Sequence, residues 1–228
     1  MIAHEAAHIH FAAKLDLRIP NTFGNPPSLN DYPAAFQIAA MHIWDEYAAT
    51  RMSGYIDPDA ATGYQENLKT LVTAAEPFRI ERVTAYRLHG DHKRIFGELN
   101  GFAESLLCSL AYLLGHLDSL EQEVDSLPSM VALMTSTLGL GDLVQELHGH
   151  LHTLWETQDL WTTQEEFSPL CGLVNDLLAA YGVYMTGSGD SWRMNIPHTA
   201  ETMPTRPAVE EFCALTGRPL SSFYPDAV

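Results

Sequence analysis

Residues 106–117 read LLCSLAYLLGHL. Leucines recur in this stretch at spacings of three and four residues, which is the spacing of one face of an α-helix. The leucines of this stripe are Leu106, Leu107, Leu110, Leu113, Leu114 and Leu117. We therefore expect a core helix over residues 92–119 and a mainly α-helical protein built around it.

The same periodicity continues on both sides of this stretch. It predicts further helices near residues 2–15, 31–52, 59–90, 123–137, 141–157, 163–182 and 208–216. Pro77 is expected to kink or split the helix over 59–90. The bundle core should also include Leu147, Leu151, Leu154, Leu173 and Leu177.

One β-hairpin is expected near the C-terminus, where alternating residues of 184–196 flank the glycine-containing turn Gly187-Ser188-Gly189-Asp190. The chain thus divides into three parts. Residues 1–58 hold an N-terminal helix pair, residues 59–183 a helical bundle, and residues 184–228 the hairpin and a C-terminal tail.

The composition excludes several classes of partner. The 228 residues include 12 Lys and Arg against 29 Asp and Glu, a formal charge of −17. A chain this acidic is repelled by nucleic acid and by anionic membrane surfaces. Its three cysteines, Cys108, Cys171 and Cys213, form no CxxC pair and indicate buried thiols in a reducing compartment. With no cleavable signal and no apolar run long enough to span a bilayer, the cytoplasm is the expected location.

The motif that carries chemistry stands at the start of the chain, where residues 4–8 read HEAAH. On a helix, residues i and i+4 lie one above the other, so His4 and His8 can bind one ion. Glu5 is displaced by about 100° from His4 and flanks the pair. Zinc bound there would lower the pKa of a coordinated water to about 7, and Glu5 would take its proton as general base. The alternative is an alanine-rich helix that carries two histidines without a metal.

This HExxH pattern resembles the zincin metallopeptidases, over about residues 1–55. Phe11 and Lys14 stand where the metzincin branch has its glycine and third histidine, so the resemblance is to the gluzincin branch. In gluzincins the third ligand is a glutamate on a later helix. The resemblance therefore implies a Zn²⁺ site formed by His4, His8 and Glu46, the last within Trp44-Asp45-Glu46-Tyr47.

The periodicity of the second helix supports this choice of glutamate. Its packing stripe consists of Phe36, Ala39, Ala40, Ile43 and Tyr47. Glu46 lies on the flank of that stripe and Asp45 nearly opposite it. A carboxylate that borders a buried face is costly unless it is paired or bound to a metal. The alternative is that Glu46 lies at a partly exposed edge and pairs with a neighbouring cation.

The resemblance also implies an activity, namely zinc-dependent hydrolysis of peptide bonds in a protein or peptide substrate. Zincins place a β-sheet before the HExxH helix, whereas this sequence starts three residues before His4. It is either an N-terminally shortened form or one that lost the sheet, and we expect weak or absent activity from it. The alternative function is a non-catalytic helical interaction protein, a truncated or degenerate zincin relative.

Two other groups of polar residues indicate a functional site less clearly than the HExxH motif does. His148, His150 and His152 alternate, and on a helix only His148 and His152 lie on one face. His42, Tyr47 and Arg51 are near Glu46 in sequence, and any of them is a candidate to stabilise an oxyanion.

Overall fold

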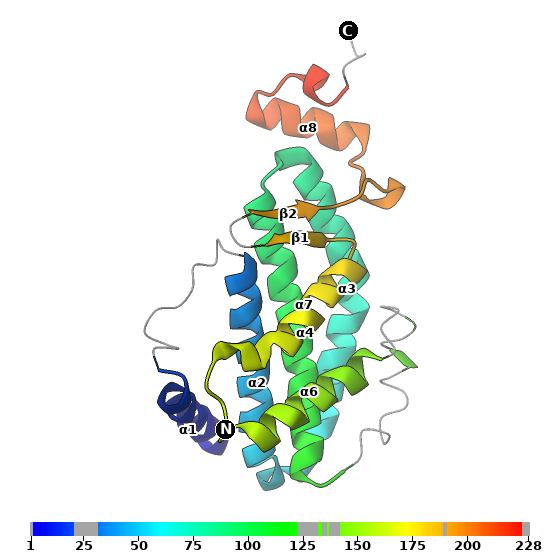
Figure 1. Cartoon of the computed structure of the whole chain (residues 1–228). Helices are drawn as coiled ribbons and strands as arrows, with labels where there is room; N and C mark the ends of the chain where they lie inside the picture. Colours follow the sequence, from blue (N-terminus) through cyan, green and yellow to red (C-terminus); the bar gives the residue numbers. More distant parts are fainter. Residues whose placement is uncertain are drawn as a thin grey trace.

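The computed structural model describes residues 2–20, 32–122, 132–133, 136, 142–188 and 191–224. In these residues the protein is mainly α-helical, with one antiparallel hairpin near the C-terminus (Figure 1). The longer helices are α1 (Ile2–Arg18), α2 (Tyr32–Ser53), α3 (Ala61–His89), α4 (His92–Ser119), α6 (Leu143–Thr157), α7 (Ser168–Ala180) and α8 (Arg206–Thr216). Short 3-10 turns cover Gly54–Ile56, Pro58–Ala60, Gln164–Phe167, Ala200–Thr202 and Leu220–Ser222. Strands β1 (Tyr184–Ser188) and β2 (Ser191–Asn195) pair in register, with Tyr184 opposite Asn195.

Helix α4 is the central element, and α2, α3, α6 and α7 all pack against it. It begins at Asp91, whose side chain accepts hydrogen bonds from the backbone N–H groups of Lys93 and Arg94. Such a side-chain cap satisfies N–H groups that have no partner within the helix. All six leucines of the predicted stripe over 106–117 are at most 2% exposed. The predicted core helix is confirmed.

Helices α2 and α4 approach each other closely. A Cβ atom at Gly115 would lie 2.5 Å from the backbone oxygen of Tyr47 and 3.1 Å from the backbone nitrogen of Arg51. Only a glycine fits that distance without moving the backbone of α2. The buried residues of α2 include several alanines, which also permit a short distance between the helices.

The remaining predicted elements agree with the structure at the level of whole helices. Helix α3 is a single element that includes Pro77, so the expected split does not occur. The residue after this proline, Phe78, stacks on Phe102 of α4 with ring centroids 4.6 Å apart, and this packing holds the chain where the proline removes one hydrogen bond. The predicted helix over 123–137 lies, apart from isolated positions, outside the described residues.

The core is continuous. The leucines predicted for it at 147, 151, 154, 173 and 177 are all buried. One cluster of buried hydrophobic residues extends from Ala7 in α1 to Ile196 after β2. It includes residues from all three predicted parts of the chain, whose boundaries stay a prediction.

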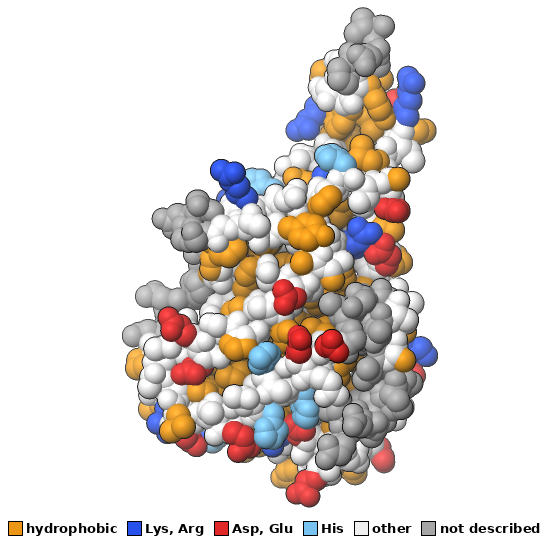
Figure 2. All heavy atoms as spheres, turned by 45° about the vertical axis from the view of Figure 1, so that its right-hand side comes forward, with side chains coloured by type: hydrophobic (Ala, Val, Ile, Leu, Met, Phe, Trp, Pro, Cys, Tyr) orange, Lys and Arg blue, Asp and Glu red, His pale blue; other side chains and the backbone are white. Residues whose placement is uncertain are grey.

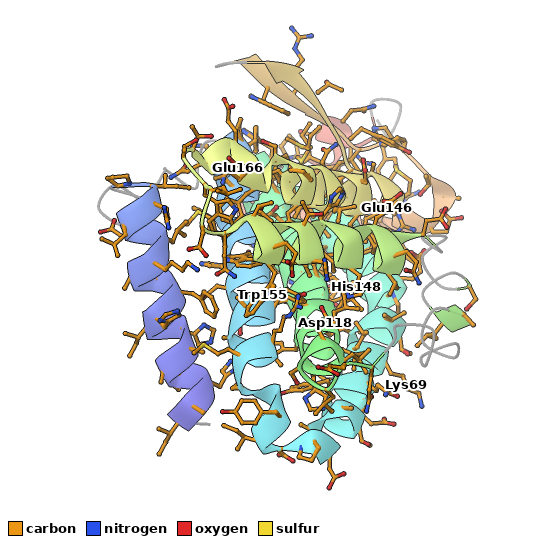
Figure 3. All side chains as sticks on the ribbon, turned by 60° about the horizontal axis from the view of Figure 1, so that its bottom comes forward. Lys69, Asp118, Glu146, His148, Trp155 and Glu166 are labelled. Carbon is orange, nitrogen blue, oxygen red and sulfur yellow. The ribbon has the colours of Figure 1, made fainter. Side chains whose placement is uncertain are left out.

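Helix α1 lies beside α2 at one side of the bundle (Figures 1 and 3). Its buried residues are Ala7, Phe11 and Leu15. The Phe11 ring lies 6.3 Å from that of Trp44 and 5.7 Å from that of Trp155 on α6. The C-terminal half of α1 is also held by ion pairs, since Lys14 and Arg18 lie 3.0 and 3.2 Å from the Asp159 carboxylate. These contacts fix the rotation of α1 about its axis.

A buried polar network joins α2, α4 and α6 (Figure 3). Asp118 on α4 accepts hydrogen bonds from Tyr47 and from His148 Nε2, the latter at 2.9 Å, and pairs with Arg51 at 3.4 Å. The Arg51 guanidinium lies over the Trp155 ring, 4.5 Å from its centroid. The groups at the centre of the network are therefore partnered, as buried polar groups must be.

The surface bears the acidic excess of the sequence. Figure 2 shows many acidic side chains and several histidines over the lower part of the face that it displays, with hydrophobic side chains exposed among them. No helix among the described residues is long and apolar enough to cross a membrane.

Replacing Phe11 by alanine should loosen α1 from the bundle. A buried phenylalanine typically contributes about 3–5 kcal/mol over alanine, and this ring is only 6% exposed. Chemical denaturation and hydrogen exchange of α1 amides would measure the effect. Leu17→Ala is the matched control, because Leu17 is on the same helix but 82% exposed. Equal effects of the two substitutions would contradict the described docking of α1.

Stability should also depend on the ionisation of Asp118. Burial alone would raise the pKa of Asp118, but hydrogen bonds from His148 and Tyr47 and the charge of Arg51 outweigh it and hold the pKa below its usual value. A carboxyl whose pKa is lower in the folded state stabilises the protein above its unfolded-state pKa of about 4 and loses that contribution as the pH falls. Denaturant unfolding of wild type and Asp118→Asn should therefore show a large difference near pH 6 that shrinks below about pH 4. A difference that is independent of pH would contradict this role.

Candidate metal centre

Two histidines of α1 and one glutamate of α2 meet between these helices. His4 Nε2 and His8 Nε2 lie 3.0 Å apart, and each lies 3.5 Å from Glu46 Oε2. The i, i+4 spacing on α1 places the two imidazoles edge to face, with ring centroids 4.5 Å apart. Among the described residues this is the one group of three or more His, Cys, Asp and Glu side chains whose ligand atoms converge closely enough for an ion. The structure brings the three predicted ligands together, while metal binding stays a prediction.

The separations fit a tetrahedral ion. Zinc is bound by nitrogen and oxygen at about 2.0–2.2 Å, which places neighbouring ligand atoms of a tetrahedron about 3.3–3.6 Å apart. The observed separations of 3.0, 3.5 and 3.5 Å lie close to that range. Three protein ligands leave the fourth tetrahedral position open, as catalytic sites require.

The Glu46 carboxylate gives a second sign of a cation site. Its Oε2 atom is buried and has no hydrogen-bond partner, although the side chain as a whole is 25% exposed. A buried carboxylate oxygen without a partner is costly. This oxygen is the atom that faces both imidazoles, so a cation shared by the three side chains would remove the cost.

Asp45 lies where the sequence did not predict it. Its Oδ2 atom is 2.8 Å from His8 Nδ1, so Asp45 faces α1 rather than the opposite side. The expectation was wrong because it assumed a single packing stripe on α2. In fact α2 is packed by α1, α4 and α7 and has buried residues around most of its circumference.

Electrostatics favour the metal-binding form of His4. Burial lowers the pKa of His4 and the neighbouring His8 lowers it further, against the charges of Glu46 and Glu5. The neutral imidazole, which has a free electron pair, is the form that binds metals. The pKa of Asp45 is raised by burial and by Glu46, while His8 acts in the opposite direction.

Two tyrosines that sequence reasoning missed border the site. The Tyr112 ring of α4 stacks on His4 with centroids 5.6 Å apart, and Tyr64 of α3 stacks on Tyr112 at the same distance. Burial raises the pKa of Tyr112, and its interaction with the Glu46 carboxylate raises it further. Tyr112 therefore keeps its proton and can donate it to an acceptor beside Glu46. Only tertiary packing places these residues there, 66 and 18 positions from Glu46 in the sequence.

Glu5, the predicted general base, is exposed on α1. Among the described residues it makes no hydrogen bond or ion pair, but its charge acts on His4. Within the described part of the chain the Glu5 carboxylate is thus free to accept a proton, and it follows His4 directly on α1.

The three oxyanion candidates near Glu46 are engaged elsewhere. Tyr47 is fully buried and bonds to Asp118, and Arg51 pairs with the same carboxylate. His42 Nδ1 lies 2.6 Å from Glu104. Of the histidine triplet on α6, His148 is likewise bound to Asp118, and no third ligand among the described residues joins it to His152.

Comparison with known proteins finds no family, no curated protein and no solved structure that matches the chain. The argument for a function therefore rests on the geometry of His4, His8, Glu46 and their neighbours.

Zinc should stabilise the protein through these three side chains. A ligand that binds only the folded state at about 100 times its Kd adds about 2.7 kcal/mol to the free energy of unfolding. Thermal unfolding with zinc and with a chelator would measure the shift in Tm. His8→Ala should abolish this shift, whereas His10→Ala should retain it, because His10 is an exposed histidine on the same helix. Loss of the shift in both variants, or in neither, would contradict the assignment.

Proposed function

We propose that the protein is a zinc metallopeptidase in which His4, His8 and Glu46 hold the ion. The observation that carries the proposal is the convergence of two imidazole nitrogens on one buried carboxylate oxygen of Glu46. The HExxH motif adds the second element of a hydrolytic site, because it places a carboxylate directly beside the ligand pair.

The roles of the side chains follow from their positions. When bound, zinc would act as a Lewis acid that lowers the pKa of a coordinated water to about 7. Glu5 would accept a proton from water and later deliver it to the leaving amine, since its carboxylate has no other partner among the described residues. His4 and His8 direct their Nε2 atoms toward Glu46. Tyr112 offers a hydroxyl donor on the Glu46 side.

A second candidate function is a non-catalytic helical interaction protein. It is favoured by the outer side of α1, where Ile2, Ile9 and Leu17 are 88%, 73% and 82% exposed. An exposed apolar helix face is typical of protein interaction surfaces. In that case the histidines and acidic residues would only hold α1 against α2 by ion pairs.

Glu5→Gln separates the two candidates. The amide keeps the shape of the side chain but accepts no proton, and loss of a general base typically costs about 10²–10⁴-fold in rate. We expect zinc-dependent hydrolysis of a peptide library to fall by this factor while the zinc content stays at one ion per chain. Asp16→Asn is the matched control, because it removes an exposed carboxylate from the same helix and should change neither quantity.

Two outcomes would overturn the peptidase proposal. Wild-type protein without bound zinc would favour the interaction protein. Zinc-loaded protein whose peptide hydrolysis, however weak, is unchanged by Glu5→Gln would leave a metal site without the proposed catalysis.

A further inference from the structure

Two consecutive acidic residues of α2 face the two nitrogens of one imidazole. Asp45 Oδ2 lies 2.8 Å from His8 Nδ1, whereas Glu46 Oε2 lies 3.5 Å from His8 Nε2. Successive residues of a helix diverge by about 100°, so the His8 ring fits between the two carboxylates. The two side chains are chemically alike but meet different atoms of His8.

The Asp45 contact decides which nitrogen of His8 bears the proton. A carboxylate only accepts hydrogen bonds, so Nδ1 must donate to it. In a neutral imidazole the other nitrogen then has the free electron pair. That nitrogen is Nε2, the atom that faces His4 Nε2 at 3.0 Å and Glu46 Oε2.

We propose that Asp45 is a positioning residue, which holds His8 as the Nδ1–H tautomer and so prepares Nε2 to bind the ion. The inference rests on the metal site proposed above. It assigns to Asp45 the role of orienting His8, which requires no contact between Asp45 and the ion. Carboxylates that accept a hydrogen bond from a ligating histidine typically change metal affinity by about 10–100-fold.

Asp45 can affect zinc binding in two ways, by orienting His8 and by its negative charge. A second acidic residue, Glu104, serves as a control for the effect of charge. Glu104 of α4 pairs with His42 at 2.6 Å, and its charge acts on Cys108 together with the charges of Asp45 and Glu46. It therefore contributes a negative charge near the site without bonding to either histidine of α1. Glu104→Gln removes that charge, together with the ion pair to His42, and leaves the contacts of both histidines of α1 unchanged.

The first measurement is the tautomer of His8 in zinc-free protein, by ¹⁵N NMR of the imidazole nitrogens at a pH where the ring is neutral. We expect a protonated Nδ1 and an unprotonated Nε2 in wild type and in Glu104→Gln. In Asp45→Asn the amide can donate as well as accept, so the Nε2–H tautomer should become populated. An Nε2–H tautomer in wild type, or an unchanged tautomer in Asp45→Asn, would overturn the proposal.

The second measurement is zinc affinity, by competition with a chromophoric chelator. Asp45→Asn should bind zinc about 10–100-fold more weakly than wild type, while Glu104→Gln should stay within a few-fold. Equal weakening by both substitutions would show that Asp45 acts through charge alone. If wild type binds no zinc, the metallopeptidase proposal fails, and the NMR result still decides the role of Asp45.

Discussion

The contact on which the site depends is the one between the first turns of α1 and the Asp45-Glu46 pair of α2. Three electron-pair donors, His4 Nε2, His8 Nε2 and Glu46 Oε2, face one another across 3.0–3.5 Å. Such an arrangement is repulsive unless a proton or a metal cation lies between the donors. The packing of the bundle must therefore hold these three atoms close to one another, and the hydrogen bond between Asp45 and His8 assists it.

Aromatic packing and distant ion pairs do this. The Phe11 ring contacts Trp44 and Trp155, and Asp159 pairs with the cations at the C-terminal end of α1. Trp155 in turn stacks under Arg51, which belongs to the buried Asp118 network. The position of the two histidines thus depends on hydrophobic contacts of Phe11, about one helical turn from His8 and about two from His4, in the same core that the leucines of α4 form.

Sequence reasoning predicted the elements whose signal is local. The leucine stripe over 106–117 predicted α4 because burial imposes a 3.6-residue period on a helix that packs on one side. The i, i+4 histidines followed from the same geometry, and Glu46 from the resemblance to gluzincins, supported by its place at the edge of a packing stripe. Asp45 was misplaced because α2 is enclosed on several sides, where a single stripe does not describe which residues face a neighbour. Tyr64 and Tyr112 could not be predicted, since only the packing of α2 and α3 on α4 brings them to the site.

The hydrogen-bond pattern also limits the protonation states that His4, His8 and Glu46 can adopt without a metal. If His8 donates from Nδ1 to Asp45, its Nε2 atom can accept from His4 at 3.0 Å, but Glu46 Oε2 then remains without a donor. If an added proton makes either imidazole cationic, Glu46 gains an ion-pair partner, but the buried position and the other imidazole oppose that charge at His4. A divalent cation meets all three electron pairs at once and leaves the Asp45 hydrogen bond intact. The Glu46 oxygen therefore adds a second argument for a metal to the HExxH pattern, because a histidine pair on a helix can arise by chance, whereas a buried carboxylate oxygen that faces the pair gains from a shared cation.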